Sequence, residues 1–232
     1  MHMKFIALFF CVAWLAGCAT KPPATLRWSG DTAYYDGLTY TAAAAAFASL
    51  VNTQPIKRLV INSGGGHVGP AIDKALLIHQ KGIEVVVRGQ CYSSCANYIF
   101  PAGAKQIIAD GSVVGWHGTV THLKYKHQMG QLALNAEDLN EYKKLSAREK
   151  EFFQRIGVDG FIAWFGKIPP YGVRDTYLLS PQDMQRFGLR NLQVRQDYVQ
   201  TNLSAFNRRD PNSLKFIEVD WAGFEAIRPQ VQ

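Results

Sequence analysis

Gly-Gln-Cys-Tyr-Ser-Ser-Cys-Ala, residues 89–96, lies between two apolar runs of different character. The β-branched run 83–87 predicts a short buried strand, and 97–100 predicts the first turns of a buried helix. Ser93 would then stand where a strand turns into a helix. N–H groups in a first helical turn have no intrahelical partner, so they can stabilise an oxyanion beside a serine hydroxyl. A serine at such a junction is more often a simple helix cap than a reactive group, so further evidence from the rest of the chain is needed to support a reactive Ser93.

Strand and helix patterns alternate on both sides of this turn. Strands are expected at 26–28, 57–62, 106–109, 112–116 and 173–178, and helices at 41–51, 71–80, 135–156 and 181–187. Such alternation predicts βαβ units with right-handed crossovers, and therefore an α/β fold with a mostly parallel sheet. The aromatic segment 160–166 is expected to pack in a groove or an oligomer contact. The tail 201–232 has no pattern that assigns it to an element.

The first eighteen residues predict an export signal. Lys4 precedes the apolar run 5–14, which has the length of a signal core and is short for a membrane span. The ending Leu-Ala-Gly-Cys resembles a bacterial lipobox, which implies cleavage before Cys18 and lipidation of that residue. Ala19 implies sorting to the outer membrane. The alternative is an ordinary secretory signal with a chance cysteine.

The expected organisation is one domain that follows a lipid anchor and a short tether in the sequence. The intervals are 1–17 for the signal peptide, 18–25 for a tether, 26–198 for the domain and 199–232 for an unassigned C-terminal extension. A chain of 232 residues with 47% hydrophobic residues can bury one sizeable core. The basic residues behind the net charge of +7 are scattered along the chain, so they indicate a solvated surface with some affinity for anionic partners, and no nucleic-acid partner.

The four cysteines fall into two groups. Cys11 would leave with the signal and Cys18 would bear lipid, so Cys91 and Cys95 remain. In an oxidising envelope a remaining pair is expected to form a disulfide, which would fix the turn around Ser93. Two buried free thiols are the alternative. Two thiols with no nearby histidine or cysteine pair do not complete a tetrahedral metal site, and no metal or cofactor is expected.

Four motifs follow one another between residues 57 and 192. They are Asn62–Val68 (Asn-Ser-Gly-Gly-Gly-His-Val), Gly89–Ser93, Ala102–Lys105 (Ala-Gly-Ala-Lys), and Arg174–Tyr177 followed by Phe187–Leu189. Their order resembles the superfamily that contains the Clp protease proteolytic subunit, signal peptide peptidase A and crotonase. The resemblance is greatest to exported Clp-protease-like lipoproteins of bacteria. It implies a crotonase-like ββα spiral.

The resemblance also implies a catalytic triad. Ser93 would be the nucleophile, His117 the base and Asp175 the residue that orients the histidine. The N–H groups of Ser94 and of Gly65 or Gly66 would form the oxyanion hole. Four other histidines are expected to be surface or core residues with no part in the site: His67, His79, His122 and His127.

Two departures from the family pattern leave alternatives open. The spacing between Gly89 and the Ala-Gly-Ala-Lys segment is one residue longer than in the Clp protease. Alignment that starts from Gly89 selects Ser93 as the nucleophile, whereas alignment that starts from the Ala-Gly-Ala-Lys segment selects Ser94. The segment after Asp175 is also one residue longer, so Asp110 or Asp183 could take its role.

The function expected from these observations is that of an envelope serine hydrolase acting on peptide bonds through an acyl-enzyme. Its partners would be a peptide or protein substrate and the membrane, through the lipid anchor, and the resemblance implies oligomers of identical subunits. One alternative is a peptide-binding lipoprotein that no longer cleaves. A crotonase-type enzyme for acyl thioesters is disfavoured, because coenzyme A esters are cytosolic and this chain is expected to be exported.

Overall fold

The computed structural model describes residues 24–206 and 213–229 of the 232-residue chain. The expected signal peptide 1–17, the lipidation residue Cys18 and most of the tether lie outside the described residues. None of the helices in the described part is long and apolar enough to cross a membrane.

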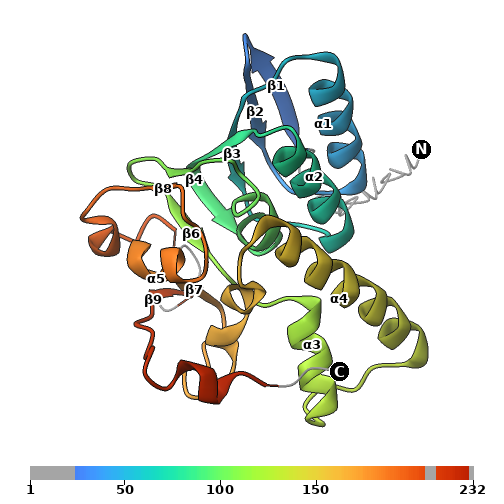
Figure 1. The fold of residues 1–232 in the computed structure, drawn as a ribbon, viewed down its shortest axis with the longest axis vertical. Helices are drawn as coiled ribbons and strands as arrows, with labels where there is room; N and C mark the ends of the chain where they lie inside the picture. Colours follow the sequence, from blue (N-terminus) through green and yellow to red (C-terminus); the bar gives the residue numbers. More distant parts are fainter. Residues whose placement is uncertain (1–23, 207–212, 230–232) are drawn as a thin grey trace, which may run out of the picture.

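Strands and helices alternate along most of the described chain (Figure 1). The strands are β1 (Thr25–Ser29), β2 (Thr32–Asp36), β3 (Arg58–Ser63), β4 (Glu84–Tyr92), β5 (Gln106–Ile108), β6 (Val113–Gly115), β7 (Thr176–Leu178), β8 (Leu192–Gln193) and β9 (Leu214–Phe216). The α-helices are α1 (Thr41–Thr53), α2 (Val68–Gln80), α3 (Val120–Gln128), α4 (Ala136–Ile156) and α5 (Pro181–Arg186). Shorter helical turns are the π-helical η1 (Cys95–Ile99) and the 3₁₀ turns η2 (Gly160–Ala163), η3 (Phe165–Lys167), η4 (Tyr198–Gln200) and η5 (Phe224–Ile227).

The central sheet contains seven strands in the order β1-β2-β3-β4-β5-β8, and β6 pairs with the second half of β4. β1 and β2 are antiparallel, whereas the other pairings in this sheet are parallel. The prediction of an α/β fold with a mostly parallel sheet is confirmed. β7 and β9 form a second, two-stranded parallel sheet.

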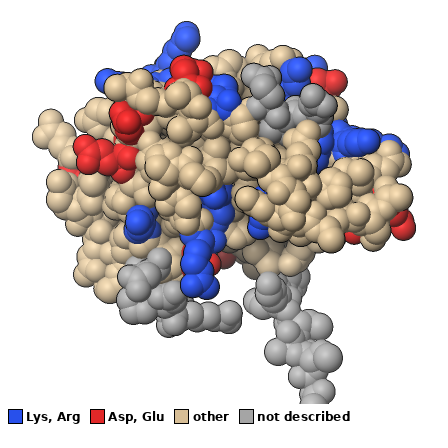
Figure 2. Space-filling view, turned by 90° about the horizontal axis from the view of Figure 1, so that it is seen from below, with Lys and Arg blue, Asp and Glu red and all other residues tan. Residues whose placement is uncertain are grey.

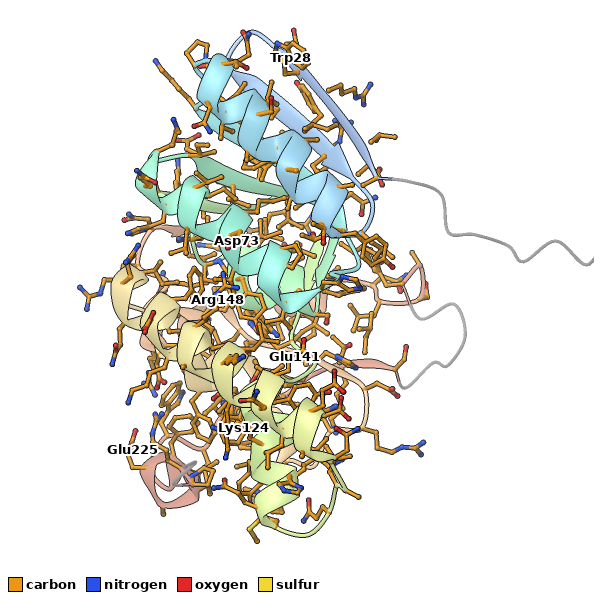
Figure 3. The ribbon with its side chains drawn as sticks, turned by 90° about the vertical axis from the view of Figure 1, so that its right-hand side faces the viewer. Trp28, Asp73, Lys124, Glu141, Arg148 and Glu225 are labelled. Carbon is orange, nitrogen blue, oxygen red and sulfur yellow. A yellow bond between two sulfur atoms is a disulfide. The ribbon has the colours of Figure 1, made fainter. Side chains whose placement is uncertain are left out.

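Three helices lie side by side on one side of the molecule: α1, α2 and α4 (Figure 3). They cover the apolar face of the sheet, where strand side chains such as Leu59, Ile61 and Val85 are fully buried. The Arg148 guanidinium contacts the Asp73 carboxylate at 2.6 Å, which joins α4 to α2. The core therefore packs directly behind the strand ends at which the candidate site lies.

β4 changes partners halfway along its length at a glycine. Its first half pairs with β5 and its second half, from Gln90, pairs with β6. Gly89 between them has φ of 100°, and a Cβ there would lie 2.9 Å from the Asn62 Oδ1 atom. The Gln90 N–H donates to that same oxygen at 3.1 Å, and the Gly89 N–H donates to Ser112 Oγ at 2.8 Å. Glycine is required here because this bend admits neither a normal φ nor a side chain.

The aromatic segment 160–166 packs into the core, where Phe161, Trp164 and Phe165 are buried. Gly160, Phe161 and Trp164 also line a groove of about 630 Å³ beside α4, so the expectation that this segment packs in a groove is met. The described part of the tail also packs into this core. Phe224 lies 5.4 Å from Phe165 between ring centroids, and β9 pairs with β7.

Candidate functional site

Ser93 lies in the turn between the end of β4 and the π-helical turn η1. It has φ of 53° and is the one non-glycine residue with positive φ in the described part of the chain. This left-handed conformation costs an L-residue roughly 1–2 kcal/mol, so the fold must hold it in place. Its N–H donates to the Gly115 carbonyl at 3.1 Å, and its carbonyl accepts from the Asn97 N–H at 2.8 Å. The side chain is half-buried, which leaves the hydroxyl accessible.

Ser94 has a different environment. Its side chain is 3% exposed, and its hydroxyl donates a hydrogen bond of 2.7 Å to the Gly66 carbonyl. That contact uses the hydroxyl proton to hold the glycine loop against the helix start. The geometry therefore favours Ser93 over Ser94 as the reactive hydroxyl.

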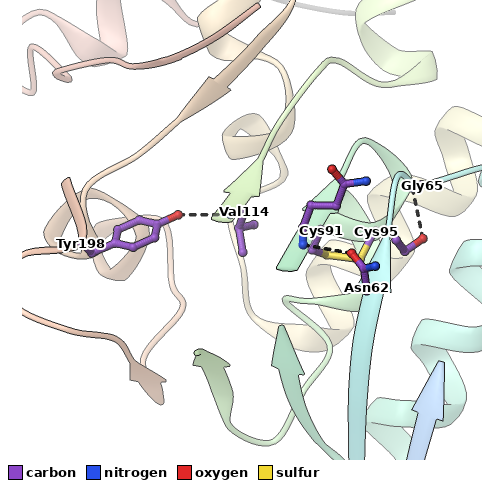
Figure 4. Close-up of a disulfide and its surroundings, with 8 residues drawn as sticks. Asn62, Gly65, Cys91, Cys95, Val114 and Tyr198 are labelled. Carbon is purple, nitrogen blue, oxygen red and sulfur yellow. Dashed lines mark hydrogen bonds between the residues drawn. A yellow bond between two sulfur atoms is a disulfide. The ribbon is translucent and has the colours of Figure 1, made fainter. Parts of the chain in front are cut away.

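A disulfide joins Cys91, on β4, to Cys95, on η1, with both residues fully buried (Figure 4). The sequence left open either a disulfide or two buried free thiols, and the structure contains the disulfide. It connects the strand before Ser93 to the helical turn after it, so it limits how far that turn can open. The Tyr198 hydroxyl accepts from the Val114 N–H at 3.1 Å on the neighbouring strand β6.

His117 follows β6, which is the parallel neighbour of β4. Tyr92 on β4 pairs with Gly115 on β6, so Ser93 and His117 follow the carboxyl ends of adjacent strands. The histidine is exposed. Desolvation nevertheless lowers its pKa, the positive charge of Lys167 lowers it further, and the Asp175 carboxylate raises it. Its imidazole is therefore neutral, and able to accept a proton, over a wider pH range than a free histidine.

Asp175 comes to this place through a backbone pairing. Trp116, beside His117, exchanges two hydrogen bonds of 2.9 Å with Tyr177, two residues after Asp175. The structure thus brings Asp175 within electrostatic range of His117. Among the described residues, no hydrogen bond joins the side chains of Ser93, His117 and Asp175. Such contacts are often long in a free enzyme and shorten when substrate binds.

The other two aspartates considered from the sequence lie in other contacts. Asp183 accepts from Ser180 Oγ at 2.7 Å and from the Trp221 indole at 2.6 Å at the start of α5. Asp110 is exposed and lies 3.5 Å from Arg195. Neither carboxylate is among the groups that act on the pKa of His117.

The glycine loop packs directly against the serine turn. A Cβ on Gly65 would lie 2.8 Å from the Ser93 Cβ and 2.9 Å from the Ser94 nitrogen, so only glycine fits. The Gly65 N–H donates to Ser63 Oγ at 3.2 Å. The Gly66 N–H has no hydrogen-bond partner among the described residues, and the Ser94 N–H belongs to a first helical turn. Of the two glycines, Gly66 is therefore the one with an unengaged N–H.

Two residues that the sequence did not single out also shape the site. The Asn97 side-chain amide donates to the Gly118 carbonyl at 2.8 Å and so holds the chain after His117. The Lys167 ammonium donates to the main-chain carbonyl of Asp175 at 2.7 Å. Asn97 lies four residues after Ser93, so a helix that begins at the serine would bring it to the same side as the site. No sequence signal connects Lys167 with Asp175.

Buried His122 also lies close to the site. Gly118 has φ of 108°, and a Cβ there would lie 2.9 Å from the His122 Nδ1 atom. The imidazole stacks on Trp164 with 6.0 Å between ring centroids. Of the surface or core positions expected for this histidine, the structure has the core one, and the ring also borders the candidate site. Comparison with models of known protein families and with curated protein sequences finds no significant match to this chain.

Proposed function

We propose that this chain is a serine hydrolase acting on peptide bonds, with Ser93 as nucleophile, His117 as general base and Asp175 as the residue that orients the histidine. The observation on which the proposal rests is the left-handed conformation of Ser93 at the junction of β4 and η1. A strained serine on a strand-to-helix turn is how several hydrolases present a nucleophile. The strain costs stability, and function is the usual reason that such a cost persists.

The proposed reaction has two steps. Ser93 Oγ attacks the peptide carbonyl while its proton passes to the His117 imidazole, and the Ser94 and Gly66 N–H groups stabilise the oxyanion. The imidazolium then gives its proton to the departing amine, which leaves an acyl-enzyme. Water, deprotonated by His117, hydrolyses that ester and restores Ser93. Each oxyanion donor contributes roughly 3 kcal/mol to lowering the barrier.

We also propose a crotonase-like ββα spiral as the fold and the cell envelope as the location. The parallel sheet with its serine turn at the strand ends supports the fold, and the Cys91–Cys95 disulfide supports an oxidising compartment. Anchoring through Cys18 is tested by Cys18→Ala, which should move the protein from the membrane fraction to the soluble fraction of cells. Retention of the variant in the membrane fraction would contradict the lipid anchor.

A fluorophosphonate probe tests the nucleophile directly, because displacement of fluoride by Ser93 Oγ forms a stable P–O bond. The full chain should be labelled, Ser93→Ala should lose more than about 99% of the label, and Ser94→Ala should keep it. Loss of label in Ser94→Ala alone would transfer the nucleophile to Ser94.

The second candidate is a peptide-binding protein of the same fold without catalysis. It is favoured by the lack of hydrogen bonds among the side chains of Ser93, His117 and Asp175 in the described chain. A folded protein that binds peptides but takes up no fluorophosphonate label, with or without reductant, would support this candidate and overturn the hydrolase.

A further inference from the structure

A groove of about 500 Å³ ends at Arg174, the residue before Asp175. One wall is α3 and the turn after it, and the other is the segment that leads from Lys167 to Arg174. Lys167 lines this wall and also contacts the candidate triad, because its ammonium donates to the Asp175 carbonyl at 2.7 Å and its charge acts on His117. The groove is therefore a candidate for the part of a substrate that extends from Ser93 past His117 and Asp175.

Four of the residues that line the groove are basic, and none is acidic. The basic ones are His122, Lys126, Lys167 and Arg174. In the described chain, Lys126, Lys167 and Arg174 form no salt bridge, whereas Arg58, Arg148, Arg195 and Arg228 each contact a carboxylate. Figure 2 views the molecule from below, the side toward which α3 ends in Figure 1, and shows Lys and Arg side chains near the middle of that face and most Asp and Glu side chains toward its edges.

The lysines of the groove act on one another and on the histidines. The pKa of His122 is lowered to about 4, first by burial and then by the charges of Lys167, Lys126 and His117. Burial lowers the pKa of Lys167, the Asp175 carboxylate raises it, and Lys126 lowers it further. An anion placed between these cations would relieve their repulsion. His122 stays neutral near pH 7, so the lysines and Arg174 provide the positive charge.

The same groove also has apolar surface. Met129 is 57% exposed, and Ile168 and Val173 line the opposite wall. Aliphatic surface beneath a set of cations suits a side chain with a short methylene stem and a carboxylate at its end. Glutamate and aspartate have this form, and glutamine provides the neutral comparison of the same shape.

We propose that this groove is a substrate subsite for acidic side chains, so that the peptides bound at Ser93 have Glu or Asp close to the bond that is cleaved. The inference rests on the proposed hydrolase function and names its substrate class. Lys126 and Arg174 are the specificity-determining residues. Charge-assisted hydrogen bonds from them to a carboxylate would raise affinity about tenfold over the neutral isostere.

Protection from labelling tests the subsite without requiring cleavage. Two sets of peptides, identical except for Glu or Gln at each position near the centre, compete with the fluorophosphonate for the full chain. The Glu set should protect at about tenfold lower concentration than the Gln set, and this ratio should fall toward one as salt rises to about 1 M. Equal protection by the two sets, or protection by neither, would overturn the subsite while the hydrolase stands.

Charge reversal provides the second arm. Lys126→Glu should remove the preference for the Glu set and create a preference for a matching Lys set. Arg174→Gln should weaken the preference for the Glu set several-fold, and it serves as the test should Lys126→Glu fail to fold. Lys144→Glu makes the same charge change at an exposed position of α4 outside the groove, so it should leave the ratio unchanged. Equal effects of Lys126→Glu and Lys144→Glu would overturn the subsite. Absence of any labelling would instead overturn the hydrolase, and the subsite with it.

Discussion

Ser94 Oγ donates a hydrogen bond of 2.7 Å to the Gly66 carbonyl, and this contact separates the two adjacent serines by role. Ser94 fastens the glycine loop to the helix start, whereas Ser93 has a left-handed backbone and no such bond. The two neighbouring serines thus have opposite effects on stability. The Ser94 hydroxyl stabilises the fold, whereas the Ser93 backbone is held in a conformation that costs free energy.

Glycine substitutions should therefore change stability in opposite directions. Ser93→Gly relieves the positive φ and should raise the free energy of unfolding by up to about 1 kcal/mol, while it abolishes fluorophosphonate labelling. Ser94→Gly removes a buried hydrogen bond and should lower the free energy of unfolding by about 1–2 kcal/mol. Urea unfolding of both variants measures this difference. Destabilisation of Ser93→Gly equal to that of Ser94→Gly would show that the Ser93 conformation is not strained.

The pH dependence of labelling should report on His117. Burial and Lys167 lower its pKa below the ordinary value of 6.5, so the neutral base should persist below pH 6.5 and the rate should fall only at lower pH. Lys167→Met removes one of these lowering charges and should move the fall in rate to higher pH. Lys144→Met, on the exposed surface of α4, is the matched control and should leave the profile in place. An unchanged profile in Lys167→Met would contradict the assignment of His117 as the base.

The sequence predicted local features of this protein well. The helix expected at 135–156 is α4, and at its start the Asn135 side chain accepts from the Asp138 N–H at 2.8 Å, which is the usual role of asparagine before a helix. The serine turn was also placed correctly, because strand, turn and helix signals there lie within about twenty residues. These features depend on neighbouring residues, so a single sequence contains them.

Contacts between distant segments were not predicted. The Trp116–Tyr177 pairing brings Asp175 toward His117, and it joins two residues that are separated in the sequence by both α3 and α4. Trp221 and Phe224 lie in the tail that no sequence pattern assigned to an element, yet Phe224 is buried and Trp221 packs on Phe187 at 5.0 Å between ring centroids. Their packing depends on a surface that exists only after the sheet and helices assemble.

The disulfide should stabilise the serine turn more than the loop length alone suggests. Closing so short a loop contributes about 2 kcal/mol in the chain-entropy description. The double variant Cys91→Ala with Cys95→Ala should lose at least that much free energy of unfolding, and labelling of Ser93 should slow because the turn loosens. Urea unfolding and labelling rates check both effects, with reductant on the wild type as the comparison. Unchanged labelling in a folded double variant would show that the bridge does not position Ser93.

Lys74 on α2 should make the protein more stable as pH rises above neutral. It is fully buried, its ammonium lies 3.4 Å from the Tyr35 ring centroid, and the nitrogen has no hydrogen-bond partner among the described residues. Burial lowers its pKa from 10.5 to about 7. Between these values the unfolded chain binds more protons than the folded one, so the free energy of unfolding increases with pH.

Replacing Lys74 by methionine should remove this dependence while it keeps the volume of the side chain. We expect Lys74→Met to raise the free energy of unfolding on the order of 4 kcal/mol at pH 7, and by about 3 kcal/mol less at pH 9.5, where the unfolded lysine begins to lose its proton. Lys144→Met should change neither value, because this lysine is exposed on α4. Urea unfolding at the two pH values measures the difference. An equal gain at both would mean that the Lys74 pKa is the same in the folded and the unfolded chain, and that the Tyr35 and Phe47 rings compensate fully for the loss of water around its charge.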